Sequence, residues 1–455
     1  MRILLVNPPA KVWSAPRVPP LGLAYIAAAL EKSGHAVTVW DAGVERVVPD
    51  MAGYDLVGAT AATPQASAAW SVLEQAKAAG AVTVLGGPHP TCLPEESLGK
   101  FWIDYVVRGE GEETIVDLAR DLERGGKGAG VAGISRKDAR GRVINEPDRA
   151  PIADLDSLPF PALKLFAPLS RYSNSQPLIG RRSPSLPILT SRGCPYGCPF
   201  CFKGVFGRKF RARSPENVVA EWEILIRKHG AAEIAVQDDA FNADPARAIR
   251  ICRLIIEKRL RHPWSAPNGI RADGVSEELM LAMKESGCER VAFGVEAGSQ
   301  GMLDSLDKKV TLAQVENAFL LARRAGIRTM GFFMFGNPGE TPGTAESTIR
   351  FAVALKPDWA QFTVATPYPG TELFETVRRE GESLVPEWDK YGHYTSEAFF
   401  RMGSVTPELV ATAMRRAYRR FYLRPGYVLR RLFDPGALGH IDQVIRGAWH
   451  LLARA

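Results

Sequence analysis

The chain has 455 residues, of which 46% are hydrophobic and 24% are charged, so it can form two or three globular domains and is not disordered. No run of about 18 apolar residues occurs, which excludes a predicted transmembrane helix. The net charge of +7 is modest for this length, and no nucleic-acid-binding motif accompanies it, which argues against a nucleic-acid partner.

The first residues and the cysteines point to the cell interior. Met1–Asn7 leads directly into an apolar strand pattern and does not resemble a signal peptide. Three of the six cysteines are clustered, which favours a reducing cytoplasm over a disulfide framework. Arginines concentrate at residues 171–213 and 415–431. These groups could meet an acidic electron donor, an anionic substrate or a membrane surface, or simply be solvated.

Residues 1–137 alternate between apolar strands and helices. The predicted strands are Ile3–Val6, Val37–Trp40, Leu56–Ala61, Val82–Leu85 and Tyr105–Val107. The predicted helices are Leu21–Lys32, Ala66–Ala79 and Glu112–Glu123, which end at Gly34, Gly80 and Gly125. This pattern predicts a Rossmann-like, doubly wound α/β domain with its ligand at the carboxyl ends of the strands. No G-x-G-x-x-G follows the first strand, which argues against a dinucleotide.

Residues 138–184 lose this periodicity and read as a linker that wraps one domain onto the other. From residue 185 the alternation resumes. The predicted strands are Leu186–Ser191, Glu233–Gln237, Trp264–Ile270, Arg290–Val295, Thr329–Phe335 and Ala360–Ala365. Helix starts are marked by Ser214, Asp244 and the Thr311/Gln314 capping box. We therefore predict an open, partial (β/α)6 barrel over 185–400 and basic helices over 401–455.

Three cysteines follow the first barrel strand in a C-x3-C-x2-C pattern: Cys194, Cys198 and Cys201. Three thiolates at this spacing can hold three irons of a [4Fe–4S] cluster and leave the fourth iron open. The alternatives are a zinc site or reduced thiols without a role. Structural zinc needs four ligands, and neither His229 nor Cys252 lies at a suitable spacing.

Other strand ends of the barrel also carry chemistry. Asp238 and Asp239 follow the second strand and could bind a metal, act as an acid/base pair or cap a helix. Arg271 follows the third strand and could pair with a carboxylate.

The cysteine spacing and the order of these loops resemble the radical S-adenosylmethionine (SAM) superfamily. The resemblance implies that SAM binds the open iron. Its implied contacts are Phe200 against the adenine, Asp239 or Asp238 on the amino group, Arg271 on the carboxylate, Glu296 near the ribose or methionyl end, and Gly336 and Pro338 in a glycine turn near the adenine. For Phe200 ordinary packing is the simpler alternative.

The N-terminal loops resemble the cobalamin-binding domain that precedes many radical SAM cores, on Pro19–Tyr25, Gly86–His89 and Gly109–Thr114. The implied cobalamin contacts are Pro8, Pro20, Leu21, Gly22, Thr60, Thr63, Gly86, Gly87, His89, Thr91, Gly109, Glu110 and Glu112. The D-x-H-x-x-G motif is absent, so the resemblance implies that no histidine ligates cobalt and that His89 lies near the nucleotide tail; otherwise it is a turn residue. The methylthiotransferase class would need further cysteines here, and only Cys92 is present.

The resemblance implies an anaerobic, cobalamin-dependent, class B methyltransferase-like enzyme. In such an enzyme a 5′-deoxyadenosyl radical activates a carbon of a small molecule, natural-product intermediate or lipid, and methylcobalamin supplies the methyl group. A flavodoxin- or ferredoxin-type protein is the expected electron donor, and contact with a membrane surface is open. The alternatives are an oxidative cyclase or ring-rearranging enzyme with the same cofactors, and a non-catalytic cobalamin sensor. No catalytic acid or base is predicted.

Overall fold

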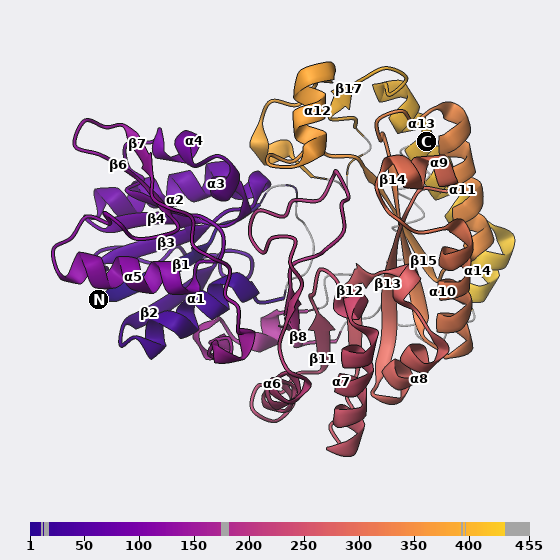
Figure 1. Ribbon diagram of the computed structural model, residues 1–455, viewed down its shortest axis with the longest axis horizontal. Coiled ribbons are helices and arrows are strands. Elements are labelled where there is room, and N and C mark those ends of the chain that lie inside the picture. Colours follow the sequence, from indigo (N-terminus) through magenta and orange to yellow (C-terminus); the bar gives the residue numbers. More distant parts are fainter. Residues whose placement is uncertain (11, 13–17, 174–181, 393–394, 396, 433–455) are drawn as a thin grey trace.

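The structure, a computed structural model, describes residues 1–10, 12, 18–173, 182–392, 395 and 397–432. Two mainly parallel sheets lie side by side, each flanked by helices (Figure 1). The segment that follows the first strand of the second sheet lies between them. In both sheets the strands alternate with helices along the chain, which confirms the predicted α/β fold class.

The N-terminal sheet has the strand order β2-β1-β3-β4-β5-β6-β7. Its parallel strands are β1 (Arg2–Asn7), β2 (Ala36–Asp41), β3 (Leu56–Thr60), β4 (Val82–Gly86) and β5 (Tyr105–Val107). Helices α1 (Leu21–Lys32), α2 (Ala66–Ala78), α3 (Pro88–Cys92), α4 (Pro94–Leu98) and α5 (Glu112–Glu123) connect them. The order reverses between β1 and β3, where a doubly wound sheet opens a crevice for a ligand.

Two antiparallel strands extend this sheet: β6 (Ile134–Lys137) and β7 (Val143–Asn145). The sequence pattern missed them, because they are short and β7 has no buried face. The sheet therefore reaches into the predicted linker. Beyond it come short 3-10 turns, η2 (Leu155–Ser157), η3 (Leu163–Leu165) and η4 (Leu169–Arg171), and Ala162 N–H donates to Ala24 C=O of α1 at 3.0 Å.

The second sheet has the order β15-β14-β13-β12-β11-β8, all parallel and in sequence order. Its strands are β8 (Ser185–Ile188), β11 (Glu233–Val236), β12 (Trp264–Ile270), β13 (Cys288–Glu296), β14 (Arg328–Phe335) and β15 (Trp359–Val364). The outer strands β15 and β8 do not pair in the described chain, so the barrel is open, as predicted. The first predicted strand is divided, because a separate two-residue strand, β9 (Ser191–Arg192), pairs with β10 (Arg211–Ala212).

Helices of the barrel begin where the sequence places their caps. They are α6 (Pro215–Arg227), α7 (Pro245–Glu257), α8 (Glu277–Glu285), α9 (Gln300–Ser305), α10 (Leu312–Arg324), α11 (Pro342–Leu355) and α12 (Glu372–Glu380), with η6 (Phe241–Ala243) and η7 (Ala272–Gly274) as short turns. Ser214 and Asp244 accept from backbone N–H groups of the first turn, and Thr311 forms its capping box with Gln314. Local side-chain chemistry thus fixes these starts.

The C-terminal region closes one side of the barrel. It contains the hairpin of β16 (Glu382–Ser383) and β17 (Phe400–Arg401), the turn η8 (Trp388–Lys390), and helices α13 (Pro407–Tyr422) and α14 (Pro425–Leu432). The two helices agree with the predicted basic helices; the remainder, 433–455, lies outside the described residues. Within the described part, no helix is both long and apolar enough to cross a membrane.

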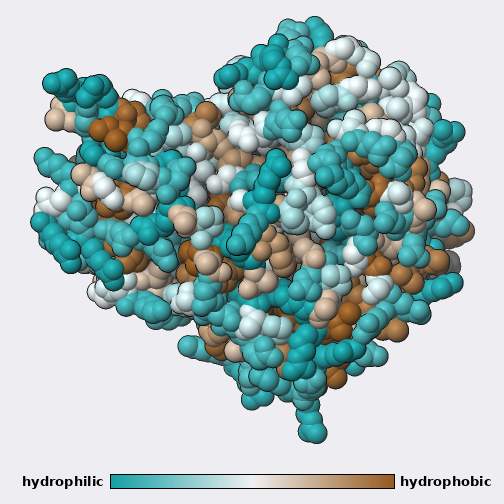
Figure 2. Space-filling view, viewed as in Figure 1, coloured by the Kyte–Doolittle hydropathy of each residue, from teal (hydrophilic) through white to brown (hydrophobic). Residues whose placement is uncertain are grey.

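The face of the molecule in Figure 2 is mostly hydrophilic, with hydrophobic residues scattered over it. Its upper edge is hollowed between the N-terminal domain and the lobe that carries α12 and β17 (Figures 1 and 2). The carboxyl ends of both sheets turn toward the region where the two domains meet, and this junction holds the predicted site residues.

Candidate active site

The cysteine motif lies in a loop that spans residues 193–210 and is closed at its base by the β9–β10 pair. Gly193 has φ of +81°, and a Cβ there would come 2.4 Å from Lys209 C=O. Glycine is therefore required for the loop to turn away from β9. Between β9 and β10 the loop contains no helix or strand.

All three motif cysteines are free thiols. The hydrogen bond with Cys201 lowers the pKa of Cys198 to about 6, and the same contact raises the pKa of Cys201. Burial raises the pKa of Cys194. Among the described residues, no three His, Cys, Asp or Glu side chains are gathered closely enough to hold a metal ion. The donor set nevertheless fits an iron–sulfur cluster, because three free thiols lie on one short loop and a cation lies beside them.

That cation is Lys308, which the sequence pattern did not single out. Its ammonium group lies 2.7 Å from Glu296 Oε1, and both side chains are 12% exposed. It is also close enough to Cys198 and Cys201 to interact electrostatically with their thiols. Glu296 ends β13 with φ of +65°, where a register shift turns its side chain. The predicted site residue Glu296 thus lies beside the cluster loop, together with a lysine 12 residues further along the chain.

Asp238 and Asp239 have different surroundings. Asp238 is fully buried and accepts hydrogen bonds from Thr190 N–H at 2.6 Å and from the hydroxyls of Thr190 and Ser191 at 2.5 Å each. These contacts tie the strand end of β11 to the segment that leads into the cysteine motif. Asp239 is exposed and interacts electrostatically with Cys194. Of the two acids, only Asp239 is available to a ligand.

Arg271 is already engaged by the protein. Its guanidinium forms two hydrogen bonds with Asp273, at 2.8 and 2.7 Å, and donates to Lys308 C=O at 2.8 Å. The guanidinium also lies 3.5 Å from the centre of the ring of Tyr196, a residue that stands between the first two motif cysteines in the sequence. Arg271 therefore supports the cluster loop and the Lys308 segment, and Lys308 and Lys203 both interact electrostatically with the Cys198 thiol.

The remaining residues predicted to contact SAM lie on the same side of the barrel. Phe200 is partly buried and packs on the main hydrophobic core. Gly336 has φ of +82° and opens a turn that Pro338 continues. This turn is held by Glu340, whose carboxylate accepts from Gly336 N–H. Burial raises the pKa of Glu340 to about 7.

At the carboxyl ends of its strands, where a doubly wound sheet has its ligand crevice, the N-terminal sheet carries loops that contact one another closely. Gly87 has φ of +102°, and a Cβ there would lie 2.8 Å from Thr60 Oγ1 and 2.9 Å from both Ala61 N and O. Thr91 Oγ1 donates to Gly87 C=O at 2.8 Å and accepts from Gly109 N–H at 3.1 Å. These contacts join three of the loops that were predicted to bind cobalamin.

A residue missed by the sequence reasoning, Gln65, joins the loop after β1 to the loop after β3. It donates to Asn7 Oδ1 at 3.0 Å and to Pro8 C=O at 2.8 Å, and accepts from Ala62 N–H at 3.2 Å. Its signal was its place in the segment that follows the end of β3. The other predicted contacts divide by exposure: Pro8 and Thr63 are buried, Pro20, Leu21, Thr60 and Gly86 are partly exposed, and Gly22 is exposed.

His89 is buried at the start of α3 and is covered by a tryptophan from the far end of the chain. Its ring lies between those of Trp70 and Trp388, with centroids 6.0 and 5.4 Å away. Glu96 lies 3.2 Å from His89 Nε2 and accepts from Trp388 Nε1–H at 2.8 Å. The aromatic C-terminal segment therefore packs on the N-terminal domain as well as on the barrel.

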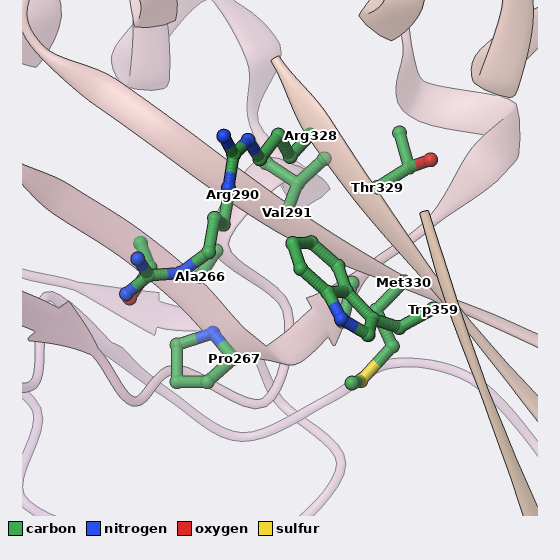
Figure 3. A pocket seen from close by; sticks show the side chains of 10 residues that line it. Ala266, Pro267, Arg290, Val291, Arg328, Thr329, Met330 and Trp359 are labelled. Carbon is green, nitrogen blue, oxygen red and sulfur yellow. The ribbon is translucent and has the colours of Figure 1, made fainter. Parts of the chain in front are cut away.

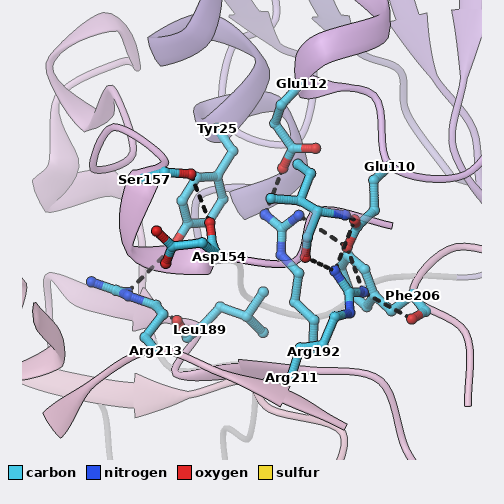
Figure 4. A network of polar contacts seen from close by, with 11 residues as sticks. Tyr25, Glu110, Glu112, Asp154, Ser157, Leu189, Arg192, Phe206, Arg211 and Arg213 are labelled. Atoms are coloured by element: carbon cyan, nitrogen blue, oxygen red, sulfur yellow. Dashed lines mark hydrogen bonds and ion pairs between the residues drawn. The ribbon is translucent and has the colours of Figure 1, made fainter. Parts of the chain in front are cut away.

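Glu110 and Glu112 point into the domain interface and form ion pairs there (Figure 4). Glu110 pairs with Arg192 at 3.2 Å and with Arg211 at 2.8 Å, and Glu112 pairs with Arg192 at 2.5 Å. All four side chains are at most 7% exposed. Both glutamates were predicted to contact cobalamin, but they pair instead with arginines at the base of the cluster loop. They do so because the two domains pack against each other at this point.

A second contact between the domains involves Cys92, Phe202 and Gly370. Cys92 Sγ donates to Pro369 C=O at 3.2 Å. A Cβ on Gly370 would lie 2.6 Å from Cys92 Sγ and 2.7 Å from the Phe202 ring. The loop after β15 therefore meets the cluster loop and α3, and all three lie at the junction.

A small pocket inside the barrel lies elsewhere (Figure 3). It is lined by the first residues of β12–β15, among them Arg290, Arg328 and Trp359. The cysteine motif follows the carboxyl end of β8, at the opposite end of the parallel strands. We therefore do not assign the chemistry to this pocket.

Comparison with known proteins agrees with this arrangement. The radical SAM superfamily matches residues 188–352, and the B12-binding domain matches residues 13–119. An uncharacterized methyltransferase of Pyrococcus horikoshii is 37% identical over 98% of both chains. The anaerobic magnesium-protoporphyrin IX monomethyl ester cyclase of Rubrivivax gelatinosus is 29% identical over 94% of this chain and 78% of its own.

Among solved structures, the radical SAM methyltransferase TsrM from Kitasatospora setae, with cobalamin and a [4Fe–4S] cluster bound, has a TM-score of 0.71 at 21% identity. The match covers 96% of this chain and 90% of that one. Its architecture is therefore that of the present fold. On the two matched domains and the 37% identical relative, the chain belongs to the B12-binding radical SAM superfamily and is a cobalamin-dependent enzyme that uses a [4Fe–4S] cluster and SAM.

Proposed function

We propose that this enzyme methylates an unactivated carbon of a small molecule, natural-product intermediate or lipid. The observation that carries the proposal is the relative described as a methyltransferase, which is 37% identical across nearly the whole of both chains. Where bound, the cluster and SAM supply a radical for hydrogen abstraction and cobalamin supplies the methyl group.

We assign the residues of this chain as follows. Cys194, Cys198 and Cys201 hold the cluster. Lys308 and Glu296 lie beside it, so that Lys308 offers a cation to the carboxylate of SAM and Glu296 offers an acceptor to its hydroxyl or ammonium groups. Asp239, exposed beside Cys194, receives the ammonium group. Arg271 positions Tyr196 and the Lys308 backbone.

Cobalamin fits the crevice at β3, β4 and β5 of the N-terminal sheet. Gly87 and Gly109 bring the backbone close, and Thr60 and Thr91 offer hydroxyl groups there. A small-molecule substrate then lies at the junction, where Phe202 and Gly370 meet α3.

The test is anaerobic incubation of the reconstituted enzyme with a reductant, hydroxocobalamin, SAM labelled in its methyl group and a metabolite extract. We expect 5′-deoxyadenosine and a labelled small molecule, neither of which forms with Cys194→Ala. Deoxyadenosine with an unlabelled, oxidised product would instead favour cyclisation, the activity named for the 29% identical relative. The electron donor is tested in the same assay by replacing the chemical reductant with reduced flavodoxin.

A further inference from the structure

The ion group formed by Glu110, Glu112, Arg192 and Arg211 lies between the two cofactor regions (Figure 4). Arg192 and Arg211 are directly opposite each other on the antiparallel β9–β10 pair, so their side chains leave the same face. Both reach the carboxylate of Glu110. One residue of the N-terminal domain thereby fastens both strands at the base of the loop that carries the cluster cysteines.

The group is neutral in total and closed off from water. Glu110 also accepts from Ile152 N–H at 2.7 Å, and Arg211 donates to Phe206 C=O at 2.9 Å. The Arg192 guanidinium lies 5.1 Å from the ring centres of both Tyr25 and Phe206. A buried ion group of this kind is favourable only in a narrow geometry, because any displacement leaves a charge desolvated and unpaired. A small shift of either domain would therefore break this pairing.

Each end of the group leads to one cofactor region. Toward the N-terminal crevice, Gly109, which precedes Glu110, donates to Thr91, and Thr91 bonds to Gly87. Toward the cluster, Arg192 is separated from Cys194 by a single glycine. Hydrogen bonds, ion pairs and two short stretches of backbone thus join the proposed cobalamin crevice to the first cysteine of the motif.

We propose that this ion group couples the two cofactors, so that assembly of the cluster raises the affinity for cobalamin and bound cobalamin stabilises the cluster. Three ligands within eight residues restrict the 193–210 loop when they bind a common cluster, since metal binding and local folding are linked. The restricted loop fixes both arginines against Glu110, which in turn fixes Gly109 and Thr91. The ordering cost is then met by whichever cofactor binds first, and the coupling is the same in both directions. The inference rests on the proposed position of cobalamin.

The test compares the dissociation constant of hydroxocobalamin, measured anaerobically by equilibrium dialysis and cobalt analysis, for protein with and without the reconstituted cluster. For the unaltered chain we expect binding at least about fivefold tighter with the cluster, the lower end of common coupling strengths. For Glu110→Gln/Arg211→Gln, which keeps the group neutral, we expect a ratio near one.

The matched control is Glu233→Gln/Arg290→Gln, because this buried ion pair lies wholly within the barrel. We expect it to keep the ratio of the unaltered chain. Circular dichroism checks folding. If the Glu110/Arg211 variant is unfolded, Arg192→Lys replaces it and should likewise give a ratio near one. Lysine keeps the positive charge but cannot contact Glu110 and Glu112 at the same time through two nitrogens.

The reciprocal measurement is the rate of iron loss to a chelator. Hydroxocobalamin should slow it in the unaltered chain and the control, and not in the Glu110/Arg211 variant. Equal hydroxocobalamin affinity with and without the cluster in the unaltered chain, or an undiminished ratio in the folded variant, would overturn the coupling. Neither measurement needs a substrate, so the result is the same whether the product is methylated or cyclised.

Discussion

In the proposed cofactor sites, the two domains offer different chemistry. The barrel uses charged or ionisable side chains at its strand ends: three thiols, the Glu296–Lys308 pair and Asp239. The N-terminal crevice uses backbone groups, hydroxyls and an amide, from Gly87, Gly109, Thr60, Thr91 and Gln65. Its two carboxylates, Glu110 and Glu112, face the barrel instead.

This difference has a physical reason. A cluster and SAM are small and charged, so a few buried charges hold them strongly. A large ligand with many amide groups is held by many weaker hydrogen bonds and by close backbone approach. Single substitutions should therefore abolish function at the barrel and weaken it by degrees at the crevice.

The largest effect is expected for Cys194→Ala. Anaerobic reconstitution should give roughly four irons per chain in the unaltered protein and almost none in the variant, because the cluster needs all three thiolates. Iron analysis and visible absorbance measure this. Cys252→Ala is the control, since Cys252 is buried in helix α7 away from the loop. Iron retained by the Cys194 variant, or zinc in place of iron, would contradict the cluster assignment.

Lys308→Met should weaken SAM binding by roughly 100-fold, as it removes a cation and leaves Glu296 buried without its partner. Calorimetry of SAM binding to the cluster-loaded protein measures it. The adjacent Lys309 is exposed and pairs only loosely with Asp307, at 3.6 Å, so Lys309→Met should bind SAM normally. Equal affinities for the two variants would show that Lys308 does not contribute to the site.

Glu340→Gln should change how stability depends on pH. Burial raises the pKa of Glu340 to about 7, from 4.5 in the unfolded chain. The folded state therefore holds the proton more tightly, and stability is lost as pH rises from about 4.5 to about 7, by up to about 3 kcal/mol. Glutamine stays neutral, so the variant should match the unaltered protein at pH 4 and exceed it at pH 8. Thermal unfolding at both pH values measures the difference in stability between the two proteins. A difference that is the same at both pH values would contradict the raised pKa of Glu340.

Gly87→Ala should give the smallest effect, a loss of cobalamin affinity of about tenfold. The added methyl group would press on Thr60 and Ala61, and the positive φ of Gly87 disfavours any side chain. Equilibrium dialysis with hydroxocobalamin measures it. Gly301→Ala serves as control, because a Cβ there has open space. If Gly87→Ala binds hydroxocobalamin as the unaltered chain does, the cofactor does not lie against this turn.

The sequence by itself determined those features of the fold that depend only on residues close together in the chain. Helices α1 and α5 have the predicted bounds, and the caps at Ser214, Asp244 and Thr311 form as expected, because a cap and its partner lie within one helical turn. The prediction that the three cysteines hold a cluster rests on their spacing alone. The parallel order of both sheets followed from the alternation of strands and helices.

The tertiary structure decided which of several eligible side chains face a ligand. The side chains of Asp238 and Arg271 form hydrogen bonds within the protein. Lys308, which belongs to no recognisable motif, interacts instead with the thiols and with Glu296. Glu110 meets Arg211, 101 residues later, and Trp388 covers His89 from the far end of the chain. Such pairings are set by how two domains pack, and periodicity carries no information about partners so distant in sequence.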